Sequence, residues 1–258
     1  MQPSFVSSGS HRDSCSFCIS KTAQAVFSFW RLRSDQQELA GILRRFEEVT
    51  KNNFRNRRKE EACMSVPEKK RVVVAMSGAS GVVLGIEILR VLRANPAYET
   101  HVVLSRGAEL TIAAETEHTV EEVLQWADHV YDNNNVGARI ASGTFKTEGM
   151  LVVPCSMKTV AGIASGYSDN LLLRAADVTL KERRPLILAP RESPLGIIHL
   201  RNLLEVAEAG ALLLPPVISY YQKPVSLEDM NRQIAGKILD KLGIETPGFR
   251  RWGEEDTL

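Results

Sequence analysis

Four short stretches combine small, hydroxyl-bearing and charged residues in a way that suits an anionic ligand. They are residues 77–81 (SGASG), Ser105, residues 155–159 (CSMKT) and the pair Arg191 and Glu192. Small residues let a backbone approach a phosphate or a flat ring closely, and hydroxyl groups and cations can bind the phosphate. Together the four stretches predict a site for a phosphorylated, planar ligand, although each serine taken singly could equally be a helix cap.

The first of these stretches lies between an apolar run at 72–76 and an apolar helical stretch at 82–92. A strand, a small-residue turn and a helix in this order point free backbone N–H groups and a helix N-terminus at an anion. The spacing of Gly78, Gly81 and Gly85 departs from the G-x-G-x-x-G pattern of dinucleotide sites. On its own the turn leaves two interpretations open, a nucleotide or flavin site and a structural tight turn.

Charged residues near these stretches could complete a phosphate pocket. Arg174 and Lys181 are seven residues apart, so a helix would place them on one face. Glu115 and Glu192 are candidates for proton transfer, or else salt-bridge partners of the same basic groups. The five histidines show no metal-ligand spacing, so no metal is expected, and Cys155 has no histidine close in sequence that would make it a nucleophile.

The elements that must position these residues alternate regularly after residue 70. Apolar runs predict strands at 72–76, 99–104, 150–153, 185–189 and 211–214. The segments between and after them predict helices at 82–92, 107–114, 120–127, 156–164, 170–181, 197–209 and 226–242, with a loop at 132–143. Such alternation predicts an α/β fold with a parallel sheet and helices on both faces, whose ligands bind beyond the carboxyl ends of the strands.

Composition sets wider limits. The chain has 258 residues, 44% hydrophobic and 24% charged, with a net charge of +1, which suits one sizeable soluble domain with an appendage. This charge gives no reason to expect nucleic acid, and no run approaches the roughly 18 apolar residues of a membrane span. The four cysteines form no disulfide framework, which favours a reducing compartment and therefore the cytoplasm.

Residues 1–63 differ in composition from the rest of the chain. They are rich in serine at the start and hold eleven Lys/Arg against seven Asp/Glu, and those acids argue against a mitochondrial presequence. The C-x-x-C pair Cys15 and Cys18 lacks a second ligand pair, which favours chance spacing, and residues 35–49 predict a short amphipathic helix. Met64 resembles a natural N-terminus just before the first strand. We therefore expect residues 1–63 to be a poorly ordered extension, with the functional domain at 64–258.

Residues 71–252 resemble the UbiX/Pad-type flavin prenyltransferases, the partners of UbiD-type decarboxylases. The matching stretches include SGASG (77–81), THVVLSR (100–106), MLVVPCSMKT (150–159), RAADVTLKERRPLILAPRESPL (174–195) and RRW (250–252). The resemblance implies a Rossmann- or flavodoxin-like fold, a three-layer, doubly wound parallel sheet. It also implies FMN as the cofactor and a homo-oligomer, typically a dodecamer.

The reaction that the resemblance implies joins a dimethylallyl group from dimethylallyl monophosphate to N5 and C6 of reduced FMN. It uses no metal, and the prenylated FMN passes to a UbiD-type decarboxylase. Because the leaving group is a monophosphate, catalysis needs a basic pocket that stabilises developing negative charge. The recipient could serve quinone synthesis or the breakdown of phenolic acids.

Roles follow from the resemblance residue by residue. FMN would be bound by Gly78, Ala79, Ser80, Ser105, Ser156, Met157, Lys158, Thr159 and Arg191. Ser80 would lie near the flavin N5, and Glu115 would lie by the ring and assist proton movement. Dimethylallyl phosphate would be bound by Arg174, Lys181, Glu192, Tyr221 and Lys237, with Glu192 as a candidate acid/base. The implied catalytic set is Ser80, Glu115, Arg174, Lys181 and Glu192.

One departure from the family concerns Val136, which stands where some members have a Trp that shields the allyl group. The resemblance therefore leaves rate and prenyl selectivity open at this position. Two other functions also stay open. One is a flavin-dependent decarboxylase of the same fold, whose usual histidine after the first helix and Asn motif are not evident here. The other is a non-catalytic FMN-binding subunit of an aromatic-acid decarboxylase complex, which would need no second phosphate pocket.

Overall fold

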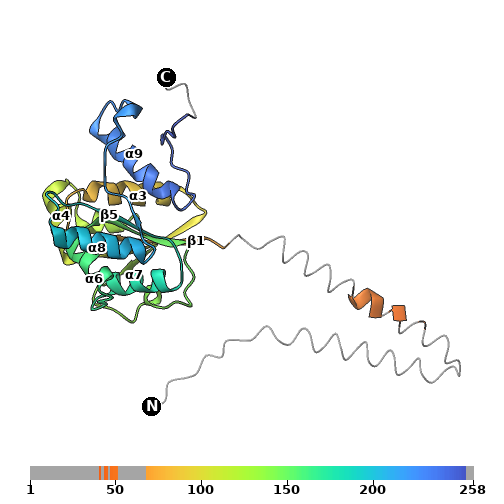
Figure 1. Ribbon diagram of the computed structural model, residues 1–258. Coiled ribbons are helices and arrows are strands. Elements are labelled where there is room, and N and C mark those ends of the chain that lie inside the picture. The colour runs from red at the N-terminus through yellow and green to blue at the C-terminus, as the bar shows by residue number, and fades with distance from the viewer. Residues whose placement is uncertain (1–40, 42–43, 46, 52–67, 254–258) are drawn as a thin grey trace, which may run out of the picture. The chain divides into compact units, whose positions relative to one another are not determined.

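The computed structural model describes residues 41, 44–45, 47–51 and 68–253, and the chain divides into two units, Met1–Val66 and Pro67–Leu258 (Figure 1). In the first unit the described residues are helical, and most of them fall in the segment 35–49 that was expected to form a helix. The C-x-x-C pair Cys15 and Cys18, and the expected domain start at Met64, lie outside the described residues.

Six parallel strands form one sheet in the second unit, in the order β3-β2-β1-β4-β5-β6. Their bounds are β1 Lys70–Met76, β2 Tyr98–Leu104, β3 His129–Tyr131, β4 Gly149–Cys155, β5 Leu186–Pro190 and β6 Leu212–Leu213. The chain runs outward from β1 in one direction to β2 and β3, then returns to place β4 on the other side of β1. The strand order therefore reverses at β1 and β4, and ligands of such sheets bind at this reversal.

Helices cover both faces of the sheet, which confirms the expected three-layer α/β fold (Figure 1). Their bounds are α3 Val82–Ala94, α4 Arg106–Glu115, α5 Val120–Leu124, α6 Met157–Ala164, α7 Leu171–Lys181, α8 Ile197–Glu208 and α9 Leu227–Asp240, with 3₁₀ turns η1 Arg139–Ala141 and η2 Tyr220–Gln222. One hydrophobic core joins the sheet to α3 and α9, and a second joins it to α6 and α7.

Strand β1 shows why the sequence pattern is a continuous apolar run. Val72, Val74 and Met76 belong to one core, whereas Val73 and Ala75 belong to the other. Successive side chains of a strand point to opposite faces, and here both faces are covered. A strand buried on both faces must be apolar throughout, so alternation is lost and the run itself becomes the signal.

The main differences from the sequence-based prediction concern β3 and β4, whereas the bounds of the other strands shift by one or two residues. Strand β3 was not predicted, because it has three residues, pairs only with β2 and contains no apolar run. The predicted helix at 120–127 ends at Leu124, before β3 begins. Strand β4 was expected to stop at Val153 but continues through Pro154 to Cys155, with an irregular register against β5. Proline has no N–H for the strand ladder, which accounts for the irregularity.

Within the part of the chain that the structure describes, no helix combines the length and apolar character that crossing a membrane requires.

Candidate functional site

The carboxyl ends of β1, β2 and β4 bring three predicted site serines close together. The backbone N–H of Ser105 donates to the carbonyl of Met76 at 3.0 Å. The backbone N–H of Ser156 donates to Oγ of Ser77 at 2.7 Å. These hydrogen bonds join segments that lie far apart in the sequence, so the strand ends meet at one edge of the sheet as the alternation predicted.

A cavity of about 320 Å³, here called the strand-end cavity, opens beside these serines. Five residues expected to bind FMN line it, namely Gly78, Ser105, Ser156, Lys158 and Thr159. The sequence analysis missed the other lining residues, which are Arg106, Gly107, Asn133, Asn170, Leu172 and Leu173. A volume of this size lies within the usual range of ligand pockets, and the lining supplies cations, hydroxyl groups and amides.

Asn133 reaches the cavity through contacts that leave no local signal in the sequence. Its side-chain Oδ1 accepts the backbone N–H of Leu172 at 3.0 Å, and its carbonyl accepts the N–H of Leu171 at 2.8 Å. The loop after β3 is therefore fixed to the start of α7, and composition alone gave only a loop here.

Gly78 is required by packing as well as by any ligand. A Cβ atom on Gly78 would lie 2.9 Å from the Cα of Gly107, which is closer than real side chains come to a backbone atom. The turn after β1 and the start of α4 therefore touch backbone to backbone at the wall of the strand-end cavity. This close contact confirms the expected need for a small residue and identifies its neighbour.

Ser105 and Ser156 cap helices and also line the strand-end cavity. Oγ of Ser105 accepts the N–H of Ala108 at 3.2 Å, and Oγ of Ser156 accepts the N–H of Thr159 at 3.3 Å, so each caps its helix. The same two residues line the strand-end cavity. Capping fixes the position of both side chains, and the Ser156 hydroxyl also lies 3.1 Å from that of Thr159.

The N-terminus of α3 is occupied differently from the expectation. The sequence suggested free N–H groups for a bound anion, but Oε2 of Glu115 accepts the N–H of Gly81 at 2.9 Å and that of Val82 at 3.3 Å. The anion at this helix end is thus a carboxylate of the chain itself. It also holds Glu115 beside the turn that contains Ser80, so these two predicted catalytic residues lie in the same neighbourhood.

Arg174 and Lys181 line a second cavity of about 590 Å³, here called the basic cavity, which confirms that they share a helix face. Its charged lining residues are four bases and one acid: Lys146, Arg174, Lys181, Arg184 and Glu182. Nη1 of Arg174 lies 2.6 Å from Oδ2 of Asp177, and Nζ of Lys181 lies 3.6 Å from Oε1 of Glu182. The excess of bases favours binding of an anion.

The other residues expected to bind substrate lie elsewhere in the chain. Lys237 lines a third cavity of about 220 Å³ with residues of β6 and α9. Tyr221 belongs to η2, where its ring meets that of Trp252 edge-on with centroids 5.0 Å apart. Arg191 and Glu192 follow β5 and are exposed, and Oε1 of Glu192 accepts the N–H of Ser193 at 2.9 Å. A single chain therefore distributes the predicted substrate residues over several places.

The remaining predicted residues have clear positions. Ala79 and Ser80 are half-buried in the turn after β1, and Met157 is buried at the start of α6. Val136, at the position where some family members have Trp, is exposed in the loop after β3. Cys155 is fully buried, and burial raises the pKa of its thiol. A thiol held protonated in this way is a poor nucleophile, as expected from the sequence.

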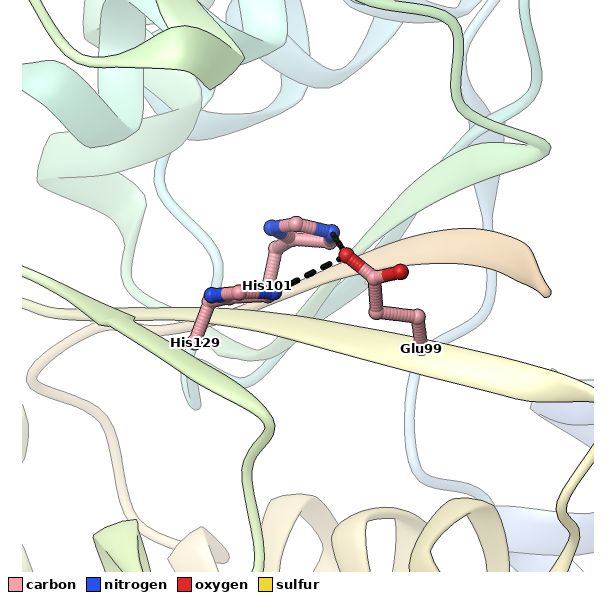
Figure 2. A group of neighbouring side chains, drawn as sticks. All are labelled: Glu99, His101 and His129. Atoms are coloured by element: carbon pink, nitrogen blue, oxygen red, sulfur yellow. Dashed lines mark ion pairs between the residues drawn. The ribbon is translucent and has the colours of Figure 1, made fainter. Parts of the chain in front are cut away.

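Histidine spacing in the sequence suggested no metal-ligand group, and the fold brings three side chains of metal-ligating type together. Glu99, His101 and His129 approach one another on β2 and β3 (Figure 2). Strand pairing, rather than sequence spacing, brings them together, because His101 and His129 are register partners.

A family model described as Flavoprotein matches residues 61–238. A probable UbiX-like flavin prenyltransferase of Sedimentibacter hydroxybenzoicus is 51% identical over 182 residues, which cover 70% of this chain and 96% of the relative. The flavin prenyltransferase UbiX of Escherichia coli K12 is 46% identical over 185 residues, which cover 71% of this chain and 98% of the relative.

Two of the solved structures that this chain resembles match the fold of its second unit. AnUbiX (PadA1), in complex with FMN and dimethylallyl pyrophosphate, has a TM-score of 0.71 at 49% identity and covers 73% of this chain and 100% of its own. A dodecameric FMN-dependent UbiX-like decarboxylase from Escherichia coli O157:H7 has a TM-score of 0.69 at 44% identity and covers 70% of this chain and 98% of its own.

Proposed function

The chain belongs to the flavoprotein family and, within it, to the UbiX-like flavin prenyltransferases, and we propose that it joins the dimethylallyl group of dimethylallyl monophosphate to reduced FMN. The product is prenylated FMN, and the reaction class is alkyl transfer. The observation that carries this proposal is the presence of two cavities with phosphate-binding chemistry, the strand-end cavity and the basic cavity. A protein that only binds FMN needs one phosphate site, whereas this transfer needs a second for the leaving group.

The strand-end cavity fits FMN. Ser105 and Ser156 place the N-termini of α4 and α6 at its wall, where helix ends favour a phosphate, and Lys158 adds a positive charge. Gly78 and Gly107 line this cavity and pack backbone against backbone in its wall. Reduced FMN supplies the nucleophilic N5 and C6 atoms. We assign the remaining FMN contacts to Ala79, Ser80, Met157, Thr159 and Arg191.

The chain's own residues bind and orient the second substrate. Arg174 and Lys181 hold its phosphate and stabilise the negative charge that develops as the C–O bond breaks. Glu192 moves a proton at the departing phosphate, and Tyr221 and Lys237 complete the pocket. Ser80 and Glu115 lie together near the turn after β1, which suits a role beside the reacting edge of the flavin.

Assembly of several copies would gather these residues, and we propose a homo-oligomer, a dodecamer like the Escherichia coli O157:H7 relative. Exposed apolar side chains of this chain support the proposed assembly. Large apolar side chains on α8 and in the segment after β6 are 59–76% exposed, namely Ile197, Ile198, Leu204, Val217 and Tyr220. Exposed apolar patches of this kind mark protein interfaces. We further assign the product to a UbiD-type decarboxylase as recipient, and the reaction to the cytoplasm.

A second candidate function is decarboxylation, the activity named for the Escherichia coli O157:H7 structure. One experiment separates the two. The full chain is incubated without oxygen with reduced FMN and dimethylallyl monophosphate, and the flavin is examined by mass spectrometry. A parallel sample receives FMN and an aromatic acid, and release of CO₂ is followed. A flavin heavier by one C₅ unit supports the proposal, whereas CO₂ release with an unmodified flavin supports the decarboxylase.

A further inference from the structure

A cluster of ligand-type side chains lies in the amino-terminal half of β2, away from the cavity at the carboxyl ends of the strands. β2 and β3 pair in parallel with His101 opposite His129. Glu99 precedes His101 by two residues, so both point to the same face of β2. Figure 2 shows the carboxylate of Glu99 facing the ring nitrogens of both histidines.

The three ligand atoms converge. Oε1 of Glu99 lies 3.0 Å from Nε2 of His101 and 2.9 Å from Nε2 of His129. All three atoms lie within 4.8 Å of one another. His101 is 0% exposed, and its Nε2 lies 3.0 Å from Oε1 of Glu99 without meeting the geometry of a hydrogen bond. A buried ring nitrogen whose polar neighbour is poorly aligned is costly in a protein, and a ligand that both groups can bind would remove this cost.

We propose that Glu99, His101 and His129 form a binding site for a divalent transition-metal ion such as Zn²⁺. Two imidazoles and one carboxylate, with one position open to water, form a frequent zinc ligand set. Zinc–ligand bonds of roughly 2.0–2.2 Å place the ligand atoms of a tetrahedral site about 3.4 Å apart. The observed 2.9 and 3.0 Å separations from Oε1 of Glu99 would open slightly to admit the ion, and the two Nε2 atoms, which lie within 4.8 Å of each other, would adjust to the same spacing.

Ring orientation tells which ligand must move. The two imidazoles are stacked, with centroids 4.7 Å apart and 15° between their planes, so their lone pairs lie in two nearly parallel planes and cannot both point at one ion. The His129 side chain is 37% exposed, whereas His101 is fully enclosed. His129 therefore turns about its Cβ–Cγ bond to direct its lone pair at the ion, and His101 and Glu99 provide the fixed part of the site.

Tyr131 prepares His101 for metal binding. Nδ1 of His101 lies 2.9 Å from the hydroxyl of Tyr131, which can accept the Nδ1–H and leave the Nε2 lone pair for the metal. Such a hydrogen bond fixes the ring orientation and the tautomer that presents Nε2 to a metal.

Positive charges around the cluster lower its affinity for a metal ion. Nε of Arg71 lies 4.0 Å from Oε1 of Glu99 and opposes a bound cation. The same guanidinium is bound by Oε1 of Glu68 at 2.6 Å and lies over the ring of Phe145, 5.0 Å from its centroid. Arg139 adds a further positive charge near Tyr131. The site therefore binds a metal less tightly than one with two carboxylate ligands.

Zinc titration of the full chain tests the proposal. The protein is stripped with a chelator and titrated with Zn²⁺ by calorimetry in a buffer that does not bind zinc. Every variant carries Cys15→Ser, Cys18→Ser and Cys63→Ser, so that these thiols do not contribute. We expect one Zn²⁺ per chain in this background. The affinity falls at least tenfold in His129→Ala and in Glu99→Gln, and about tenfold in Tyr131→Phe.

His118→Ala is the matched control, because His118 lies outside the cluster and contacts Arg90. It keeps the zinc affinity of the background. FMN binding, measured on the same samples, stays unchanged in all variants. This separates loss of the metal site from loss of the fold. The zinc affinity is also independent of the proposed enzyme activity. The proposal is overturned if the background binds no zinc, or if His129→Ala binds it as tightly as the background.

Discussion

Oε2 of Glu115 accepts the backbone N–H of Gly81 at 2.9 Å and so joins the last residue of α4 to the turn that begins α3. A carboxylate at a helix N-terminus is stabilised by the partial positive charge of that end. The hydrogen bond thus fixes one assigned catalytic residue, Glu115, against the turn that holds another, Ser80. The geometry of this turn therefore depends on the negative charge of the Glu115 side chain.

Glu115→Gln tests this relationship. Gln keeps an acceptor oxygen but loses the charge, so we expect the free energy of unfolding to fall by about 0.5–1 kcal/mol. If Glu115 also assists proton movement at the flavin, the prenylation rate falls by about 100-fold or more, beyond what the stability change explains. Urea unfolding and single-turnover rates measure the two effects. Glu117→Gln, an exposed change two residues later, leaves both unchanged.

Glu192→Gln separates catalysis from cofactor binding. The variant keeps an oxygen for the N–H of Ser193, now 2.9 Å away, and so retains the local structure. General acid/base groups contribute roughly 10²–10⁴-fold to rates, so we expect turnover to be lost by about that factor while FMN stays bound. Product formation by mass spectrometry and flavin fluorescence give the two values. Unchanged turnover would remove Glu192 from the mechanism, and Glu208→Gln on α8 serves as the control.

Gly78→Ala probes the backbone contact at the strand-end cavity. The added methyl would lie 2.9 Å from the Cα of Gly107, so the turn or α4 must shift. We expect a loss of about 1–3 kcal/mol in the free energy of unfolding, together with weaker FMN binding. Gly137→Ala is the control, since its nearest neighbour would be a side-chain oxygen of Asn135 at 3.5 Å. Equal FMN affinity in both variants would show that the contact does not shape the cavity.

His101 makes the fold sensitive to acid. Burial lowers its pKa from 6.5 to about 4, so between these values the unfolded chain binds the proton and the folded chain does not. Stability is therefore complete above about pH 6.5 and is lost progressively as the pH falls towards 4. Urea unfolding at pH 7 and pH 5 in the presence of a chelator measures this loss. His101→Gln should flatten the dependence, whereas a His118→Gln protein with an equally flat profile would contradict the assignment.

Deleting residues 1–63 tests the domain boundary. The family match begins at residue 61 and the compact second unit at Pro67. We expect residues 64–258 to fold, bind FMN and form prenylated FMN at the rate of the full chain, because the cavities lie within residues 78–238. Comparing the two proteins in the same anaerobic assay decides the point. A slower shortened protein with intact FMN binding would assign the extension a role in turnover.

The elements and their caps could be predicted from the sequence because their causes are local. The apolar runs of β1, β2 and β4, and the cap residues Ser105 and Ser156, lie where the pattern placed them. Parallel strands then required the strand-end residues to meet at one edge, and the structure bears this out for Ser77, Ser105 and Ser156. The resemblance to the flavin prenyltransferases extended the prediction from a site for an anion to a site for FMN.

Tertiary structure alone decided the pairwise contacts. Glu115 meets Gly81, Gly78 meets Gly107 and His101 meets His129 because the order and register of the strands place them there, and no local pattern encodes either. The same holds for Lys237, which lines a different cavity from Arg174 and Lys181, whereas the shared helix face of these two followed from their spacing. A short edge strand such as β3 gains its stability from its neighbour β2, so the cluster on it becomes visible only once the whole sheet is formed.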